Sequence, residues 1–306
     1  MTKVLIATVK PFAPVAVAGM KKIFDNAGFE LQLLEKYADQ SALVKAVENV
    51  DALIVRSDIV DEEVINAGNN LKIVVRAGAG YDNVDLKAAS AKDIVVMNTP
   101  GQNSNAVAEL AIGMMIFLNR KGFDGSAGTE LKGKTLGLHA YGNVGRLIGK
   151  IAKGIGMTVH AFDPYIDKQL IEKDGIIYET DIKNLYTKCQ YVAVIIPATD
   201  DTKESINHDL LSLMPKGATL VNPARKEIIC EKSILQMFEE RDDFRYISDI
   251  TPGCKDEIAA KYEGRYLFTP KKMGAQTAEA NINAGLAASS QIVKFINEGD
   301  KTFQVN

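Results

Sequence analysis

Short apolar runs alternate with amphipathic stretches along almost the whole chain of 306 residues, which predicts strands and helices in turn. In the first hundred residues the runs with the length of strands are Lys3–Val9, Glu30–Leu34, Ala52–Arg56, Ile73–Arg76 and Ile94–Met97. Helical patterns lie between them, and Gly28 can cap the end of the first helix. Because this alternation is typical of βαβ units, we expect parallel sheets.

A second alternating set runs from Thr135 to about Phe268. The run Val107–Leu118 precedes it and places its apolar residues on one helical stripe, which indicates core packing for its methionines. After the set, residues 277–296 form one long helical pattern that ends at Gly299. Two such sets in one chain predict an α/β fold of two doubly wound parallel-sheet domains, with an active site in the cleft between them.

The segment GKTLGLHAYGNVGR (residues 133–146) joins a predicted strand, Thr135–His139, to a helix that starts near Val144. Gly142 lets the backbone approach a pyrophosphate, which N–H groups at the start of the helix can then hold. Gly145 lets this helix pack close to the strand. The arrangement predicts a dinucleotide-binding site, and therefore a Rossmann domain in the second half of the chain.

Asp163 ends the next predicted strand, Thr158–Phe162, eighteen residues after Gly145. Its carboxylate can accept hydrogen bonds from ribose hydroxyls and would repel the 2′-phosphate of NADP, so NAD is the expected cofactor. Ala140 stands at the first glycine of the usual pattern. A tight turn can tolerate an alanine there if its φ stays negative.

The first domain should present the substrate, and we expect it to be a flavodoxin-like domain. With crossings near Pro100 and Ala284, residues 1–100 and 284–306 form the substrate domain and residues 101–283 form the NAD-binding domain.

Charge and composition exclude several classes of protein. There are 36 Lys and Arg against 39 Asp and Glu, a net charge of −3 without blocks of one sign, which argues against nucleic-acid or membrane binding. No apolar run reaches the ~20 residues of a membrane span, and the first ten residues lack the pattern of a signal peptide. Cys189, Cys230 and Cys254 lack metal-ligand spacing, so we expect reduced thiols, a cytoplasmic protein and no metal.

The whole chain resembles the D-isomer-specific 2-hydroxyacid dehydrogenases, and among them most closely the short phosphoglycerate dehydrogenases. Besides the dinucleotide loop, the resemblance is carried by the segments Val55–Ile65, Leu71–Ala89, Val95–Leu110, Val192–Asn207 and Leu220–Ile229. It implies two doubly wound domains, the first of them discontinuous, and a homodimer. It also implies hydride transfer between C2 of a 2-hydroxy acid and the nicotinamide.

The resemblance assigns two catalytic positions directly. Arg225 in NPAR matches the arginine of the family, whose planar fork suits a substrate carboxylate. Asp249 in YISDIT matches the aspartate that contacts the nicotinamide amide. The shortened segment Arg120–Leu131 departs from the family and leaves the contacts of the dimer open.

The acid/base group departs from the family pattern. Cys254 stands where a glutamate is usual, and TPKKMGAQT replaces the TPH motif, which puts Lys271 at the position of the histidine. The joint loss of histidine and glutamate is coherent, because an imidazole needs a carboxylate to fix its tautomer whereas an ammonium needs no such partner. Lys271 is therefore the expected acid/base, and Lys272 is the alternative if the alignment is off by one residue.

The resemblance also implies the binding residues. Those expected at the cofactor are Tyr141, Gly142, Asn143, Val144, Gly145, Asp163, Pro164, Pro197, Thr202, Asn222, Pro223, Ala224, Asp249 and Gly274. Those expected at the substrate are Arg56, Ser57, Arg76, Gly78, Ala79 and Asn103, with N–H groups of Gly78 and Ala79 on the carboxylate and the two arginines near the acidic end.

Three functions remain open at this stage. The first is NAD-dependent oxidation of 3-phospho-D-glycerate to 3-phosphohydroxypyruvate, which feeds serine synthesis. The second is reduction of an unphosphorylated 2-keto acid such as glyoxylate or hydroxypyruvate. The third is a non-catalytic NAD-sensing protein that has lost its base.

Overall fold

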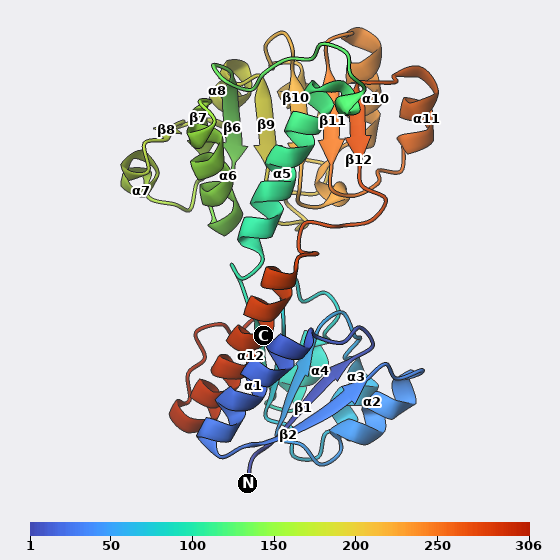
Figure 1. Ribbon diagram of the computed structural model, residues 1–306, viewed down its shortest axis with the longest axis vertical. Helices are drawn as coiled ribbons and strands as arrows, with labels where there is room; N and C mark the ends of the chain where they lie inside the picture. Colours follow the sequence, from blue (N-terminus) through green and yellow to red (C-terminus); the bar gives the residue numbers. More distant parts are fainter. The chain divides into compact units, whose positions relative to one another are not determined.

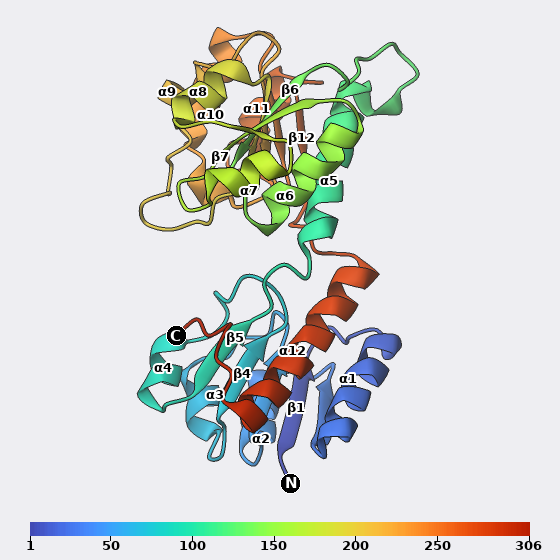
Figure 2. The same cartoon turned by 90° about the vertical axis from the view of Figure 1, so that its left-hand side faces the viewer.

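The computed structural model describes all 306 residues, and they form two compact units. Unit 1 comprises Met1–Asn103 and Gln276–Asn306, and unit 2 comprises Ser104–Ala275 (Figures 1 and 2). The return to unit 1 thus precedes the expected crossing at Ala284. The reason is that the long helix α12 (Ala278–Glu298) belongs to unit 1 as a whole.

Unit 1 contains a parallel sheet with the strand order β2-β1-β3-β4-β5. Its strands are β1 (Lys3–Thr8), β2 (Glu30–Glu35), β3 (Ala52–Val55), β4 (Ile73–Arg76) and β5 (Val95–Asn98). Its helices, besides α12, are α1 (Pro14–Ala27), α2 (Gln40–Val47), α3 (Glu62–Ala67) and α4 (Leu86–Ala91). This order is that of flavodoxin-like domains and confirms the prediction.

Helices cover both faces of this sheet. Val4 and Ile6 of β1 pack in the core under α1 and α12, whereas Leu5 and Ala7 pack in the core under α2, α3 and α4, as the alternation of a strand requires. Helices α1 and α12 lie side by side (Figure 2) and interlock closely, because a Cβ on Gly285 would lie 2.8 Å from Met20 Sδ. Gly28 ends α1 with a φ of 73°, which confirms the predicted cap.

Unit 2 contains a parallel seven-stranded sheet with the order β12-β11-β10-β9-β6-β7-β8. Its strands are β6 (Thr135–His139), β7 (Thr158–Phe162), β8 (Ile177–Tyr178), β9 (Tyr191–Val194), β10 (Thr219–Asn222), β11 (Arg245–Ser248) and β12 (Tyr266–Phe268). Its helices are α5 (Ser104–Asn119), η1 (Lys121–Phe123), α6 (Asn143–Gly154), α7 (Lys168–Lys173), α8 (Ile182–Lys188), α9 (His208–Leu211), η2 (Lys226–Ile228), α10 (Glu231–Glu240) and α11 (Lys255–Lys261). The strand order confirms the predicted Rossmann domain.

The strand order of unit 2 reverses between β6 and β9. In an open parallel sheet, ligands bind beyond the carboxyl ends of the strands at such a reversal. The loops that follow β6, β9, β10, β11 and β12 all leave from this edge, and they carry most of the residues that the sequence assigns to the cofactor and to catalysis.

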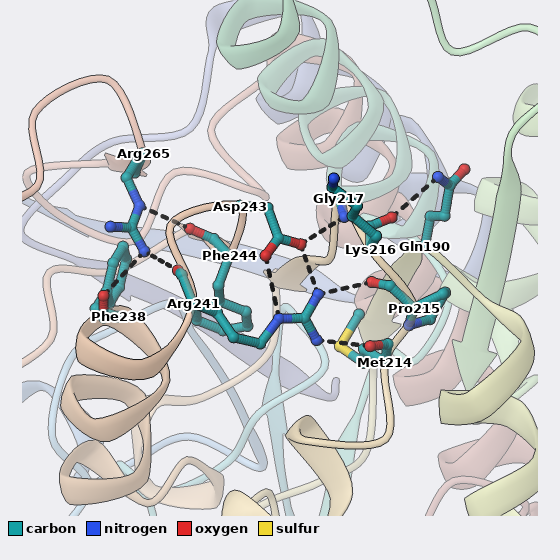
Figure 3. A network of polar contacts seen from close by, with 10 residues as sticks. All are labelled: Gln190, Met214, Pro215, Lys216, Gly217, Phe238, Arg241, Asp243, Phe244 and Arg265. Atoms are coloured by element: carbon teal, nitrogen blue, oxygen red, sulfur yellow. Dashed lines mark hydrogen bonds and ion pairs between the residues drawn. The ribbon is translucent and has the colours of Figure 1, made fainter.

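The opposite edge of the same sheet carries a network of ion pairs and hydrogen bonds (Figure 3). Arg241 pairs with Asp243 at 2.5 Å and donates to the Met214 carbonyl at 2.6 Å, while Asp243 accepts from Gly217 N at 2.6 Å. Arg265 donates to the backbone carbonyls of Phe238 in α10 and of Arg241 and Phe244 in the loop that follows. The hydrogen bond from Arg241 holds the pKa of Asp243 at about 2. These contacts tie together the loops that enter β10, β11 and β12.

None of the helices combines the length and the apolar character needed to cross a membrane. The three cysteines form no disulfide. No three His, Cys, Asp or Glu side chains are grouped so that they could hold a metal ion.

Candidate active site

The turn after β6 has the form that a pyrophosphate site needs. Gly142 is the N-cap of α6, and a Cβ built on it would point into open space, where the backbone can therefore be approached closely. A Cβ on Gly145 would lie 2.5 Å from the Ala140 carbonyl oxygen, so only glycine allows α6 to start so close to the strand. Both glycines thus have the geometry predicted for them.

Ala140 does not follow the expectation of a negative φ, because its φ is 98°. Its N–H donates to the Phe162 carbonyl at 2.9 Å, and the next N–H, that of Tyr141, donates to Asp163 at 2.7 Å. These two bonds to the neighbouring strand end fix the turn and force the alanine into a conformation that costs roughly 1–2 kcal/mol.

Asp163 lies at the end of β7 and is 6% exposed. Its Oδ2 accepts from Tyr141 N at 2.7 Å, and its Oδ1 accepts from Tyr165 N at 2.9 Å. Each carboxylate oxygen keeps a further lone pair, so Asp163 can brace the turn and still accept hydrogen bonds from a ribose.

Some predicted cofactor residues shape the loops with their side chains. The Tyr141 ring is buried and its hydroxyl donates to Asp174 at 2.9 Å, so only the backbone of Tyr141 faces the turn. Thr202 Oγ1 donates to the Pro197 carbonyl at 2.6 Å and closes the loop after β9. Asn143 and Pro164 are exposed, and Val144 is half-buried.

Asp249 follows β11 and is 1% exposed. Its carboxylate accepts from Thr269 Oγ1 at 3.0 Å, from Met273 N at 2.8 Å and from Gly274 N at 2.7 Å. A Cβ on Gly274 would lie 2.8 Å from Asp249 Oδ2, which explains the glycine. Asp249 therefore fixes the backbone of the segment 269–274, which carries both candidate lysines.

Of the two lysines, Lys272 and not Lys271 turns toward Asp249. Lys272 Nζ donates to the Pro223 carbonyl at 2.9 Å and the Ala224 carbonyl at 2.6 Å, and lies 3.7 Å from Asp249 Oδ2. Lys271 is exposed. The sequence prediction of Lys271 came from its position directly after Thr-Pro. In the structure, Asp249 accepts hydrogen bonds from the backbone N–H groups of Met273 and Gly274, directly after Lys272, and this orients the Lys272 side chain toward Asp249.

Burial lowers the pKa of Lys272, and the positive charge of Arg225 lowers it further, whereas Asp249 opposes the shift. Arg225 follows β10, is half-buried, and donates from Nη1 to the Ala224 carbonyl at 3.2 Å. Lys272 and Arg225 therefore share one carbonyl acceptor. Two cations and one carboxylate gather at this edge, which can bind an anionic substrate and exchange a proton with it.

The three histidines contact residues outside the group formed by Lys272, Arg225 and Asp249. His139 Nδ1 lies 3.2 Å from the Tyr186 hydroxyl. Burial lowers the pKa of His139 to about 4, so this side chain is neutral near pH 7. His160 Nδ1 lies 2.7 Å from Glu179 Oε1, and His208 Nε2 lies 2.8 Å from Glu240 Oε2. Cys254 is buried at the start of α11, and burial raises the pKa of its thiol to about 12.

In unit 1 the guanidinium of Arg56 is held within the unit. Its Nη1 donates to the Lys10 carbonyl at 2.7 Å and the Pro11 carbonyl at 3.1 Å, and its Nη2 donates to Asn281 Oδ1. Arg56 thus ties β3 to the loop before α1 and to α12. Arg76 Nε donates to the Arg56 carbonyl at 2.9 Å.

Gly78 has a φ of 156°, and a Cβ there would lie 1.6 Å from Arg76 Nη1, so any larger residue would displace the Arg76 guanidinium. Its N–H donates to the Arg76 carbonyl at 2.8 Å and so has an internal partner, while Ala79 is exposed. Ser57 is exposed and lines a hollow of ≈ 250 Å³ at the carboxyl ends of β1, β2 and β3. Asn103 is half-buried and directly precedes α5.

A family model described as D-isomer specific 2-hydroxyacid dehydrogenase, catalytic domain, matches residues 6–306. The chain belongs to this family. The expectation of an enzyme with this fold and this class of chemistry is confirmed.

Three relatives illustrate how this dehydrogenase compares with known proteins. It is 33% identical over 284 residues to hydroxypyruvate reductase from Thermotoga maritima, covering 87% of this chain and 91% of that protein. It is 33% identical over 291 residues to D-3-phosphoglycerate dehydrogenase from Methanocaldococcus jannaschii, covering 90% of this chain. The structure of NAD⁺-bound 3-phosphoglycerate dehydrogenase from Entamoeba histolytica matches with a TM-score of 0.88 and 46% identity, over 100% of this chain and 98% of that chain.

The matched length differs among the relatives. The dehydrogenase spans 55% of the length of the enzyme from Methanocaldococcus jannaschii and 56% of the length of human D-3-phosphoglycerate dehydrogenase.

Proposed function

We propose that the protein oxidises 3-phospho-D-glycerate to 3-phosphohydroxypyruvate with NAD, a step that would feed serine synthesis. The observation that carries the chemical part is the placement of Lys272 beside Arg225 and Asp249 at the carboxyl edge of a Rossmann sheet. The choice of substrate is supported by the 46% identity to a phosphoglycerate dehydrogenase.

The residues present fit NAD. The space beside Gly142 and the start of α6 suit a pyrophosphate, and the Asp163 carboxylate suits the ribose hydroxyls. When bound, the nicotinamide supplies the hydride acceptor for C2 of the substrate.

Three residues of unit 2 then divide the remaining work. Arg225 binds the substrate carboxylate through two parallel N–H donors. Lys272, as a neutral amine, accepts the proton of the 2-hydroxyl group. Asp249 holds the segment 269–274 in place and opposes the loss of the proton from Lys272, which keeps the ammonium available for the reverse reaction. This assigns to Lys272 the role that the sequence had suggested for Lys271.

A second candidate function is reduction of hydroxypyruvate or glyoxylate. It is supported by the match to hydroxypyruvate reductase. It is also supported by the internal hydrogen bonds of Arg56, which weaken the expectation that Arg56 binds the acidic end of a substrate.

A substrate panel distinguishes these functions. We expect NAD-dependent oxidation of 3-phosphoglycerate to exceed that of D-glycerate and D-lactate, measured as NADH absorbance. Faster turnover of unphosphorylated acids, or of hydroxypyruvate and glyoxylate with NADH, would favour the second function. Binding of NAD without turnover of any of these compounds would contradict both functions.

Asp163 should set the preference for NAD over NADP. Its buried carboxylate would face the 2′-phosphate, and Asp163→Asn removes the repulsion while it keeps the size of the side chain. We expect the variant to bind NAD more weakly and to narrow the ratio of kcat/KM for the two cofactors. Equal or better efficiency with NADP in the unaltered protein would contradict this role of Asp163.

We also propose a homodimer. Ile116 and Phe117 of α5 are 37% and 39% exposed, and the Phe117 ring contacts that of Phe123, which is 63% exposed. Such an apolar group on the surface suits a second copy of the chain. Light scattering should give about twice the chain mass of 33.3 kDa, and a monomer at all concentrations would contradict the proposal.

A further inference from the structure

Asn222 is the last residue of β10 and is 1% exposed. Its Nδ2 donates to the Arg225 carbonyl at 2.8 Å, and its Oδ1 accepts from Ala224 N at 3.0 Å. Both polar atoms of the side chain are therefore used within the turn that follows the strand. The side chain closes residues 222–225 into a fixed shape.

This turn presents two carbonyl oxygens to the segment that carries the lysines. The carbonyls of Pro223 and Ala224 accept hydrogen bonds from Lys272 Nζ at 2.9 and 2.6 Å. The Ala224 carbonyl also accepts from Arg225 Nη1 at 3.2 Å. The positions of both cations thus depend on one short turn.

The two carbonyls constrain the direction in which Lys272 can exchange a proton. A neutral amine has two N–H bonds and one lone pair. If both N–H bonds point at fixed acceptors, the lone pair has one direction left. A change in the turn that displaced these carbonyls would change the orientation of the Lys272 amine. A misplacement of a catalytic group by about 1 Å can lower a rate by about 10²-fold.

We propose that Asn222 is a positioning residue that closes the 222–225 turn and thereby aims the Lys272 amine relative to Arg225. The inference rests on the proposed function, in which Lys272 exchanges the proton and Arg225 holds the carboxylate. It assigns Asn222 to the acid/base chemistry and not to direct contact with the cofactor, which the sequence alone had suggested.

The charges around Lys272 determine how its titration reports on the turn. Asp249 faces it from the end of β11, and Arg225 and Glu227 face it from the segment after β10. Burial is the largest cause of the lowered pKa of Lys272. When the turn opens, water reaches the amine and Arg225 is no longer held beside it, so the pKa of Lys272 should rise.

The first test needs no turnover. Asn222→Ser and Asn222→Asp both remove the donor to the Arg225 carbonyl, and the second is nearly isosteric. Lysines of the intact protein are acetylated with acetic anhydride across the neutral and alkaline pH range, and modification of Lys272 and Lys271 is measured by peptide mass spectrometry. In the unaltered protein Lys272 should titrate below the ordinary pKa of a lysine, because it is buried. Labelling of the exposed Lys271 shows that the reagent reaches this segment.

In both Asn222 variants we expect the midpoint for Lys272 to move up toward the ordinary pKa of a lysine, with the larger shift in Asn222→Asp because it adds a negative charge. Ser248→Ala is the matched control, because Ser248 pairs with Asn222 in the sheet register and its hydroxyl lies outside the 222–225 turn. Its labelling should equal that of the unaltered protein. An unchanged Lys272 midpoint in folded Asn222→Asp would overturn the proposal.

The second test uses kinetics. We expect kcat to fall by about 10²-fold in the Asn222 variants, with the KM for NAD nearly unchanged and with the pH dependence of kcat displaced in the same direction as the labelling. A weaker affinity for NAD with unchanged labelling would assign Asn222 to the cofactor and overturn the positioning role. If the protein turned over no substrate, the proposed function would fail, and the labelling would still decide whether Asn222 controls Lys272.

Discussion

Two cations and one carboxylate lie at the amino ends of β10, β11 and β12, and two cations and one carboxylate lie at their carboxyl ends. The two groups of charges are nevertheless built differently. At the amino ends, Arg241 contacts Asp243 directly at 2.5 Å, and the pKa of this carboxyl is about 2. At the carboxyl ends, Asp249 accepts from a hydroxyl and two backbone N–H groups, and Lys272 stays 3.7 Å away.

This difference shows how one sheet separates stability from chemistry. A carboxylate bonded directly to a guanidinium is fixed in its charged form, and so is its partner. A carboxylate satisfied by neutral donors leaves a nearby lysine able to change its charge. We therefore expect substitutions at the carboxyl ends to alter activity and substitutions at the amino ends to alter stability.

The largest effect is expected for Lys272→Met. Removal of a general acid/base lowers the rate by about 10² to 10⁴-fold, whereas Lys271→Met should have little effect because that side chain is exposed. Oxidation needs the neutral amine, so the rate should rise with pH, and the lowered pKa of Lys272 places the midpoint below the usual ~10.4. Steady-state rates of both variants and the pH dependence of the unaltered protein test these expectations, and the affinity of both variants for NAD serves as the control.

The reverse pattern, with Lys271→Met inactive and Lys272→Met active, would return the role to Lys271. Full activity of both variants would remove a lysine base from the mechanism.

A loss of roughly two or more powers of ten in kcat/KM is expected for Arg225→Ala, which corresponds to about 2.7 kcal/mol or more. Arg225→Lys should also be poor, because an ammonium cannot form two parallel hydrogen bonds to a carboxylate. Urea unfolding of both variants should match that of the unaltered protein. Near-normal kcat/KM in Arg225→Lys would show that a point charge suffices there.

The smallest effect is expected at the amino ends, where Asp243→Asn should lower the free energy of unfolding by about 1–2 kcal/mol at pH 7. The folded-state pKa of about 2 lies below the usual 3.8, so the contribution of Asp243 is present above the usual value and is lost as the pH falls toward 2. Urea unfolding at a series of pH values should show this loss in the unaltered protein and not in the variant.

Asp242 is exposed and provides the control. We expect Asp242→Asn to change the free energy of unfolding less than Asp243→Asn does. A fall in kcat without a change in stability for Asp243→Asn would contradict the assignment of stability to the amino ends and of activity to the carboxyl ends.

Patterns of burial made most of the fold predictable. β4, β6 and β7 have the predicted bounds, because burial along a strand or helix produces a regular spacing of apolar residues in the sequence. Gly142 and Gly145 were predictable because the close approach of a backbone excludes any side chain. The features that the sequence does not reveal depend on partners far along the chain.

Ala140 shows this clearly, because its positive φ is set by Phe162 and Asp163 on the neighbouring strand. Adjacent lysines have equal chemistry, and the choice between them is made by hydrogen bonds from the segment 273–274 to Asp249. The sequence assigns Arg56 to the substrate, yet its guanidinium forms hydrogen bonds to the segment 10–11 and to α12 within unit 1.

The packing of α12 on α1 also sets an order of events during protein synthesis. Unit 2 is one continuous segment, 104–275, and it emerges from the ribosome before α12 does. At 5–20 residues per second, α1 waits roughly 13–50 s for the helix that covers Met20 and Phe24. The Rossmann domain can therefore complete its core first. Until α12 emerges, the incomplete flavodoxin-like domain exposes apolar surface to which molecular chaperones would bind.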